Sequence, residues 1–223
     1  MKHLLSKSKY IRGLQCERAL YLDVYRPELA RISWETRQKF ARGRGFESMY
    51  KATFPNGVDV SAELGYRVDL YPERTAALLS QEGEVVVFEA GFMYDEVLVL
   101  ADVVQKTAEG RLIIHEVKNG TSVSETFRRD VAVQHYVISH CVERIDEFSV
   151  VHNDGQDGFV VVNLLEEAEA AMLEIELNVR KFKEVIRGTE PRIEMGTQCD
   201  NPYECPYKSY CGGCVSAQLE LGF

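Results

Sequence analysis

The sequence predicts an α/β fold in which helices flank a central mixed β-sheet. Two observations predict this fold: runs of alternating β-branched residues in the middle of the chain, and stretches with helical spacing on both sides of them. The chain has 223 residues, of which 45% are hydrophobic and 27% charged, a composition typical of globular proteins. A core of this size needs no disulfide bonds. We therefore expect a single domain over residues 1–223.

The helical segments are expected near both chain ends and after the third strand. Ser6 or Ser8 is a candidate cap for a first helix, and Ser33 with Thr36 precedes a stretch that runs to about Thr53. Pro27 separates these two segments. A further helix is predicted over 121–141, with a possible capping box from residue 122 to 125, and a long acidic helix over 165–187. Pro191 then marks a break before a cysteine-rich tail.

The strands are predicted from period-two alternation. Three of them, over 84–94, 97–105 and 111–118, form a meander with turns near 95–96 and 109–110. Two more strands follow over 147–152 and 159–163, joined by a turn at 153–155. The expected core order is thus three strands, a helix and further strands, with helical material from both chain ends around it.

Charge is distributed unevenly along the chain. The net charge is -9, yet residues 1–54 contain 12 of the 26 Lys and Arg residues and only 5 of the 35 Asp and Glu residues. We expect any nucleic acid to meet this basic N-terminal segment first. No apolar run is long enough to span a bilayer, and the first residues lack the apolar stretch of a signal peptide. These observations predict a cytoplasmic protein without a membrane partner.

Three charged residues on neighbouring predicted strands form the main candidate site. Glu116 and Lys118 are two apart on one strand, so their side chains leave the same face of the sheet. Asp102 lies in an apolar run of the preceding strand, where a charge is costly unless it is paired or binds a metal. Because paired strands lie about 4.8 Å apart, Asp102 and Glu116 can share a Mg²⁺ or Mn²⁺ ion, with the carbonyl of Val117 and waters completing its ligands. The alternative is a solvated face with no ligand.

This arrangement matches the requirements of phosphodiester hydrolysis. Two carboxylates can hold a metal that activates water, and the ammonium group of Lys118 can offset developing negative charge. Gln134 is expected on the apolar face of the following helix, facing either the site or a hydrogen-bond partner at the core edge. Glu47, on the basic N-terminal segment, is a candidate further metal ligand. Glu89 is a rival ligand for which we favour a structural role.

The cysteines indicate a metal or cluster site. Four of the six cysteines fall between residues 199 and 214, and a reducing compartment disfavours disulfides. Zinc ribbons usually have two closely spaced cysteine pairs, and only Cys211 and Cys214 have that spacing, so zinc is the less favoured choice. Four thiolates can instead hold an iron–sulfur cluster. If Cys16 joins Cys199, Cys205 and Cys211, the cluster links both chain ends, with Cys214 as an alternative ligand. Cys141 is expected to be a buried free thiol.

Taken in order, these motifs give the chain a resemblance to a known family. The N-terminal segment ending at Cys16, then Asp102, the Glu116-Val117-Lys118 signature, Gln134 and the C-terminal cysteines resemble the PD-(D/E)xK nucleases. The resemblance is to their iron–sulfur branch, which includes RecB/AddB-type nuclease domains and CRISPR-associated RecB-like exonucleases. It covers almost the whole chain.

The resemblance implies a restriction-endonuclease-like core over 55–187 and a helical iron–sulfur lobe formed by residues 1–54 and 188–223. It implies a 4Fe-4S cluster and Mg²⁺- or Mn²⁺-dependent DNA cleavage, with Asp102, Glu116 and Glu47 around the metal, Lys118 as catalytic lysine and Gln134 beside it. Family members often have His at the position of Glu47. No ATP-binding loop is present, so a helicase or integrase would be a separate protein.

The expected function is therefore a DNA nuclease that acts from strand ends, prefers single strands, and serves in DNA processing, repair or CRISPR adaptation. The basic N-terminal helices are expected to contact the DNA backbone through five arginines: Arg12, Arg18, Arg37, Arg42 and Arg44. The alternative is a catalytically silent DNA-binding or adaptor subunit of a larger complex.

Overall fold

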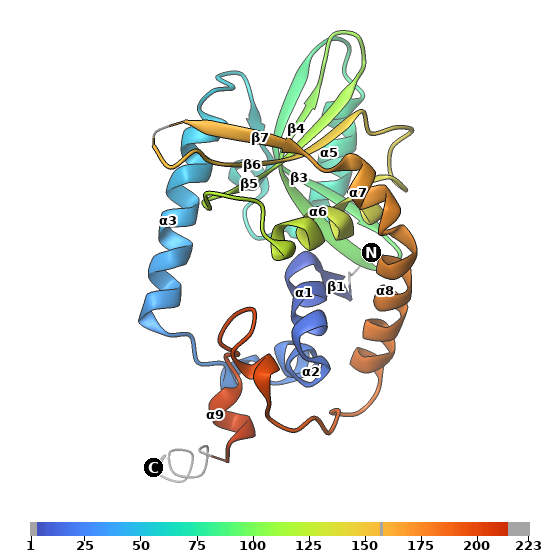
Figure 1. Cartoon of the computed structure of the whole chain (residues 1–223). Coiled ribbons are helices and arrows are strands. Elements are labelled where there is room, and N and C mark those ends of the chain that lie inside the picture. The colour runs from blue at the N-terminus through green and yellow to red at the C-terminus, as the bar shows by residue number, and fades with distance from the viewer. Residues whose placement is uncertain (1–3, 157, 214–223) are drawn as a thin grey trace, which may run out of the picture.

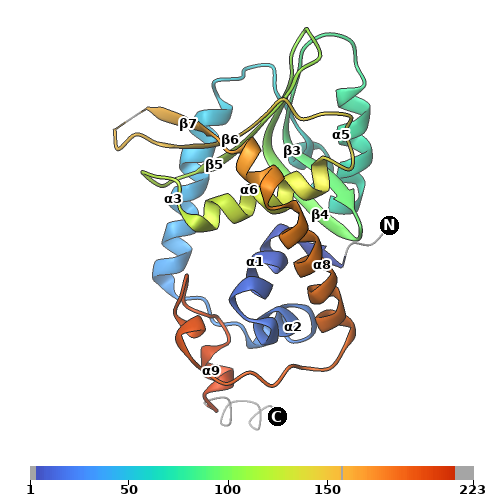
Figure 2. The same ribbon diagram turned by 45° about the vertical axis from the view of Figure 1, so that its right-hand side comes forward.

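A mixed β-sheet forms the upper part of the protein in Figures 1 and 2, with helices beside it and below it. The computed structural model describes residues 4–156 and 158–213. Within these residues the sheet has seven strands in the order β2-β3-β4-β5-β6-β7, and β1 also pairs with β4. Their bounds are β1 Leu5–Ser6, β2 Val58–Asp59, β3 Val85–Tyr94, β4 Val97–Lys106, β5 Leu112–Lys118, β6 Glu147–Asn153 and β7 Phe159–Asn163.

Strand direction makes the sheet mixed, as the sequence predicts. The β3–β4, β4–β5 and β6–β7 pairs are antiparallel, whereas β1–β4, β2–β3 and β5–β6 are parallel. The predicted meander is confirmed, and its first turn has positive φ at Asp95 (48°) and Glu96 (59°). Helix α6 supplies the crossover between the parallel strands β5 and β6.

The helices lie before, between and after these strands. Their bounds are α1 Lys7–Gln15, α2 Glu17–Tyr25, α3 Trp34–Lys51, α4 Val60–Leu64, α5 Tyr71–Leu79, α6 Glu125–Ile138, α7 Leu165–Ala170, α8 Met172–Arg187 and α9 Lys208–Cys211. Short 3-10 helices occur at Pro27–Leu29, Val68–Leu70 and Thr197–Cys199.

Side-chain caps explain where two helices begin. The Lys9 amide donates to Ser6 Oγ, so Ser6 rather than Ser8 caps α1. The Phe127 amide donates to Ser124 Oγ at the start of α6. The predicted box beginning at Ser122 is therefore wrong, and the helix starts four residues later than expected.

Two other helical predictions differ from the structure. The expected acidic helix over 165–187 is divided at Ala171 into α7 and α8. The break lets α7 pack along α6 while α8 packs against α1 and α2. Helices α4 and α5 were not predicted from the sequence.

The sheet has a hydrophobic core on each face. The larger core lies between the sheet and α1, α5, α6, α7 and α8, with further residues from α2 and α4. A smaller one lies between the sheet and the C-terminal half of α3, where Phe46 and Tyr50 pack with Val103, Val117 and Val151. Burial of such side chains contributes roughly 1.5–3 kcal/mol each, and it fixes this end of α3 over β5.

Helices α1 and α2 lie beside the C-terminal segment that includes α9, below the sheet (Figure 1). The Gln15 side chain donates to the carbonyls of Gln198 (2.9 Å) and Tyr203 (2.6 Å), and the Tyr207 hydroxyl donates to Asp23 (2.6 Å). These contacts join α1 and α2 to the C-terminal segment. No helix in the described part of the chain is long and apolar enough to cross a membrane.

Candidate functional site

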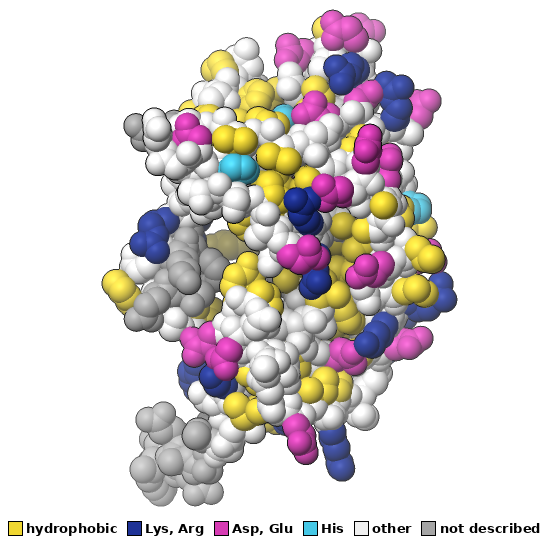
Figure 3. Space-filling model, in the orientation of Figure 1, with side chains coloured by type: hydrophobic (Ala, Val, Ile, Leu, Met, Phe, Trp, Pro, Cys, Tyr) yellow, Lys and Arg dark blue, Asp and Glu magenta, His cyan; other side chains and the backbone are white. Residues whose placement is uncertain are grey.

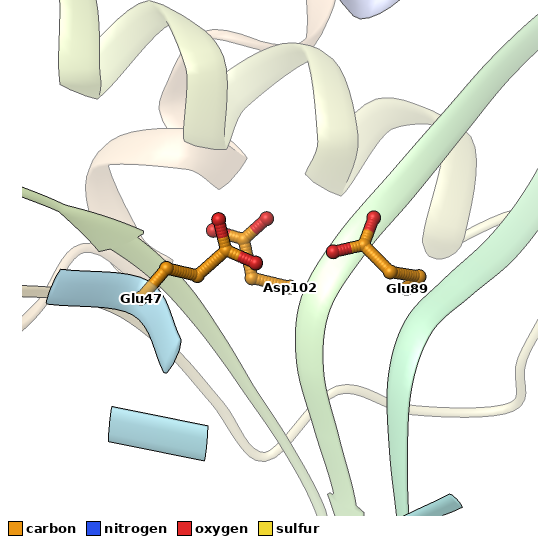
Figure 4. Close-up of side chains that lie close together, drawn as sticks. All are labelled: Glu47, Glu89 and Asp102. Carbon is orange, nitrogen blue, oxygen red and sulfur yellow. The ribbon is translucent and has the colours of Figure 1, made fainter. Parts of the chain in front are cut away.

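Three carboxylates from three elements come together beside the sheet. Glu47 lies on α3, Glu89 on β3 and Asp102 on β4 (Figure 4). One oxygen from each lies within 4.8 Å of the others, and all three residues are partly exposed. Hard divalent cations such as Mg²⁺ and Mn²⁺ prefer ligands of this kind, so the donor chemistry fits such an ion.

An irregularity in the sheet brings Glu89 and Asp102 together. The pairs between β3 and β4 have the same register on both sides of Glu89, from Val85 to Phe88 and from Ala90 onward. In this register Glu89 lies opposite Asp102, but these two residues are not paired. Glu89 has φ of +51°, unusual for a residue with a side chain. Val87 and Ala90, three residues apart, both lie in the larger core, so the strand changes its inward face at Glu89.

Asp102 also lies at a gap on the other edge of β4. That edge pairs with β1 at Val97 and Leu98 and with β5 from Val103 onward. Asp102 falls between these two partners. Its Oδ2 accepts a hydrogen bond from the Val117 amide (2.7 Å), in place of a regular bond between strands. The carboxylate is thereby fixed against β5.

Lys51 is the cation next to the three carboxylates. Its Nζ lies 2.5 Å from Glu47 Oε1 and 2.6 Å from Glu89 Oε1. Burial opposes the charge on Lys51, but Glu89 and Glu47 outweigh it and raise its pKa. This ammonium group therefore offsets part of the repulsion among the acids.

A second cluster surrounds Glu116, which is 1% exposed. Lys7 from α1 and Lys118 from β5 both lie 2.6 Å from Glu116 Oε1, and Gln134 Nε2 donates to Oε2 at 2.7 Å. Lys118 also lies 2.6 Å from Asp130 Oδ2 on α6. A buried carboxylate is tolerated here because each of its oxygens has a donor.

The two clusters give neighbouring carboxylates opposite protonation preferences. Burial, followed by repulsion from Glu116, raises the pKa of Asp102 to about 8. Burial also opposes ionisation of Glu116, but Lys118 and Lys7 outweigh it and lower its pKa to about 2. Two acids whose environments drive their pKa values apart are typical of sites that handle protons or cations.

Gln134 is fully buried and turned toward Glu116, as the sequence analysis allowed. Among the described residues, its Oε1 and His115 Nδ1 are the buried side-chain polar atoms without a hydrogen-bond partner. The carboxamide oxygen is thus left as an acceptor beside the Glu116 cluster. An unsatisfied buried acceptor costs about 1–3 kcal/mol, so it is rarely retained without a role.

The structure brings most of the predicted site residues together, in two clusters rather than one. Glu47 lies with Asp102, whereas Glu116, Lys118 and Gln134 form the second cluster. The amide of Val117 contacts Asp102. Metal binding by Glu116 and by the Val117 carbonyl stays a prediction.

Four residues of these clusters were missed or given too little weight. Glu89 was preferred as structural, yet it lies within the group of three acids. Lys7, Lys51 and Asp130 were not singled out, since each reaches its partner only through the fold. The available signal for Glu89 was its charge within an otherwise apolar strand, the same signal that identified Asp102.

Four cysteines line one small cavity between the chain ends. Cys16 follows α1, Cys199 and Cys205 precede α9, and Cys211 ends it. All four are free thiols. Burial raises the pKa of Cys205 and Cys211, and the thiols of Cys16 and Cys199 add to both shifts. A group of thiols around one space fits a bound metal or cluster. The alternative ligand Cys214 lies outside the described residues.

Cys141 differs from the prediction. It is exposed rather than buried, because α6 ends at Ile138 and the thiol lies on the connection that follows, near the Met93 carbonyl (3.5 Å). It does not line the cavity between the chain ends.

The five arginines predicted to contact DNA fall into two groups. Arg12 contacts Asp23 (3.1 Å), which links α1 to α2, and Arg18 contacts Glu190 (2.7 Å), which links α2 to the segment after α8. The other three are exposed on α3: Arg37, Arg42 and Arg44. Of the predicted set, these three are exposed to solvent, whereas Arg12 and Arg18 are half-buried.

Comparisons with known proteins leave the chain without an assigned family. No family matches the chain, and no curated protein is significantly similar to it. One solved structure that is similar is described as the crystal structure of SSO0001. It shares 15% sequence identity, the alignment covers 98% of this chain and 87% of that one, and the TM-score is 0.39. A likeness this weak carries no argument about function.

Proposed function

We propose that the protein is a metal-dependent deoxyribonuclease that hydrolyses phosphodiester bonds, acting from strand ends and preferring single strands. The observation that carries the proposal is the placement of Glu47, Glu89 and Asp102 around one point, beside the buried Glu116–Lys118 pair. Oxygen ligands for a divalent cation and a lysine for phosphate charge are the two components that such hydrolysis requires.

Each residue has a chemical task in this proposal. Glu47, Glu89 and Asp102 would hold Mg²⁺ or Mn²⁺, and a bound ion of this kind supplies a Lewis acid for phosphoryl oxygens and water. Lys118 would offset the negative charge that develops on the phosphate. Glu116 orients Lys118, since they lie 2.6 Å apart, and Gln134 fixes the other oxygen of Glu116. Lys51 would have to leave one of its carboxylate partners when a cation binds.

The finer description of the fold belongs to the same proposal. We interpret the sheet with α3 and α6 as a restriction-endonuclease-like core and the joined chain ends as an iron–sulfur lobe. Support comes from the cavity lined by Cys16, Cys199, Cys205 and Cys211. Four thiolates are the usual ligand set of a 4Fe-4S cluster. Such a cluster would link α1 to the C-terminal segment covalently.

A silent DNA-binding or adaptor subunit is the second candidate. It is favoured by the ion pairs of Glu116 with two lysines and of Lys51 with Glu47 and Glu89, because these acids already have cationic partners. In that case the clusters would be structural, and a partner enzyme would cut the strand.

A cleavage assay separates the two candidates. The full chain, purified without oxygen, is incubated with end-labelled single-stranded DNA and Mn²⁺, and in parallel with EDTA. We expect Mn²⁺-dependent shortening of the strand that Asp102→Asn and Glu116→Gln each abolish. DNA that is bound but never cut by the unsubstituted protein would refute the nuclease and support the adaptor.

A further inference from the structure

Helix α3 carries the chain's single tryptophan at the end farthest from the three carboxylates. Trp34 is its first residue, and its side chain is 69% exposed. A large aromatic side chain left in water has no packing role in the described structure. Aromatic side chains placed this way serve as platforms on which nucleic-acid bases stack.

The segment around Trp34 is strongly basic, although the whole chain is acidic. Residues 30–46 contain five Lys or Arg residues and one acid, in a protein of net charge -9. Figure 3 shows basic and hydrophobic side chains at the outer edge of the molecule along α3, and a hollow between this helix and the middle of the molecule. Positive charge interleaved with an exposed aromatic ring complements a single strand, whose phosphates and bases are both accessible.

Helical spacing separates the arginines of α3 into two faces. At about 100° per residue, Arg37 and Arg44 lie about 20° apart around α3 and Trp34 lies about 60° from Arg37, so the three form a stripe that turns gradually around the helix. The stripe continues at Glu47, three residues after Arg44, which reaches the carboxylate cluster. Arg42 is exposed but lies on the side of the helix opposite to Arg37 and Arg44.

We infer that this stripe is the track along which a single-stranded DNA reaches the carboxylates, with Trp34 stacking on a base and Arg37 and Arg44 binding the intervening phosphates. The inference rests on the proposed nuclease function and adds to it a binding subsite remote from the metal. Thirteen residues separate Trp34 from Glu47, a distance along α3 of about 20 Å. Stacked nucleotides rise about 3.4 Å each, so roughly six span the track.

Binding is measured first, in EDTA, so that cleavage plays no part. Because Trp34 is the single tryptophan, its fluorescence reports stacking directly, and we expect a single-stranded 20-mer to quench it. Trp34→Ala should raise the Kd for labelled DNA about tenfold, as expected when a base loses its aromatic platform. Trp34→Phe should recover most of the affinity. Leu173→Ala, which alters a similarly exposed apolar residue on α8, is the matched control.

The arginines are tested through salt dependence. Replacing Arg37 and Arg44 together by Ala should reduce the slope of log binding constant against log salt by about 1.4, the value for two phosphates on a single strand. Arg42→Ala should leave the slope unchanged. Thermal unfolding of each variant should match the unsubstituted protein, because all these side chains are exposed.

Oligonucleotide length supplies the test that only a track would satisfy. In Mn²⁺, Trp34→Ala should raise KM for a 20-mer and leave kcat unchanged, and it should have no effect on a tetramer, which is too short to span the track. Three results would each overturn the inference. The first is a Trp34→Ala protein whose Kd and KM for the 20-mer are unchanged, and the second is tighter binding of the unsubstituted protein to duplex DNA than to single strands. The third is a loss of salt dependence in Arg42→Ala equal to that in the Arg37 and Arg44 double variant. Failure of the unsubstituted protein to cut any DNA would instead refute the proposed function, while the quenching would remain a separate result.

Discussion

At the scale of single residues, Glu89 shows why the site is only partly readable from sequence. Asp102 was singled out by its charge within an apolar strand, and Glu116 by its spacing from Lys118. Glu89 is also a charge within an apolar strand, but it reaches the other carboxylates only because its φ is positive and the pairing of β3 with β4 is interrupted there. A strand pattern assumes regular alternation, so it cannot reveal which residue sits at an irregularity.

The first prediction concerns Glu89 itself. Glu89→Gln removes the charge of one of the three carboxylates proposed to hold the cation, so the Mn²⁺ concentration for half-maximal cleavage should rise at least about tenfold, the loss usual when a metal site is perturbed. A titration of cleavage rate with Mn²⁺ measures this. Glu84→Gln, just before the same strand and bonded to Gln105, is the control and should behave like the unsubstituted protein. Equal Mn²⁺ dependence in both variants would exclude Glu89 as a ligand.

The second prediction concerns Lys118. Lys118→Ala should lower the cleavage rate at least about 100-fold, because the charge facing the phosphate is lost. Lys7 and Gln134 still contact Glu116, so the fold and the amount of bound iron should not change. Single-turnover cleavage and circular dichroism measure the two effects. Lys181→Ala, an exposed lysine on α8, serves as control, and retained cleavage in Lys118→Ala would contradict the assignment.

At the scale of elements, the pattern of alternation predicted five of the strands well, and the capping residues predicted helix starts less well. The strands β3 to β7 were found because β-branched alternation persists over several residues. The strands β1 and β2 have two residues each, too few to show a period. Their existence is decided by the neighbouring strands β4 and β3.

The third prediction tests how α1 packs. A Cβ at Gly13 would lie 2.8 Å from the Phe182 ring of α8, whereas one at Gly45 of α3 would meet nothing within 4 Å. Ala normally stabilises a helix relative to Gly by about 1 kcal/mol. We therefore expect Gly45→Ala to stabilise the protein by about 0.5–1 kcal/mol and Gly13→Ala to destabilise it by about 1–2 kcal/mol, since overpacking outweighs propensity. Chemical denaturation measures both, and equal shifts would argue against close α1–α8 packing.

At the scale of the whole molecule, direct contacts hold α1 and α2 against the C-terminal segment. The cysteine spacing predicted that both ends contribute to one site, and all four predicted thiols line one cavity. Which group they bind remains a proposal. Ion pairs such as Arg18–Glu190 were not predictable, because 172 residues separate the partners.

The fourth prediction concerns this cavity. Cys205→Ser should remove the visible absorbance and iron content of anaerobic preparations and lower the Tm by about 10 °C. That shift corresponds to roughly 3 kcal/mol in a chain of this size. Cys141→Ser, which alters an exposed thiol outside the cavity, should change neither property. If the unsubstituted protein contains equimolar zinc and no iron, the cavity is a zinc site and the proposal of an iron–sulfur cluster is wrong.

The contact of Lys7 with Glu116 has a consequence for biosynthesis. These partners are 109 positions apart, and the thiol pocket closes only when Cys211 joins Cys16. A chain emerging from the ribosome amino end first therefore carries α1 for a long interval before its partner strand exists. The group of three carboxylates reaches no further along the chain than Asp102, and the Glu116 cluster no further than Gln134. The thiol pocket is therefore the part of the molecule that translation completes last, when Cys211 is added.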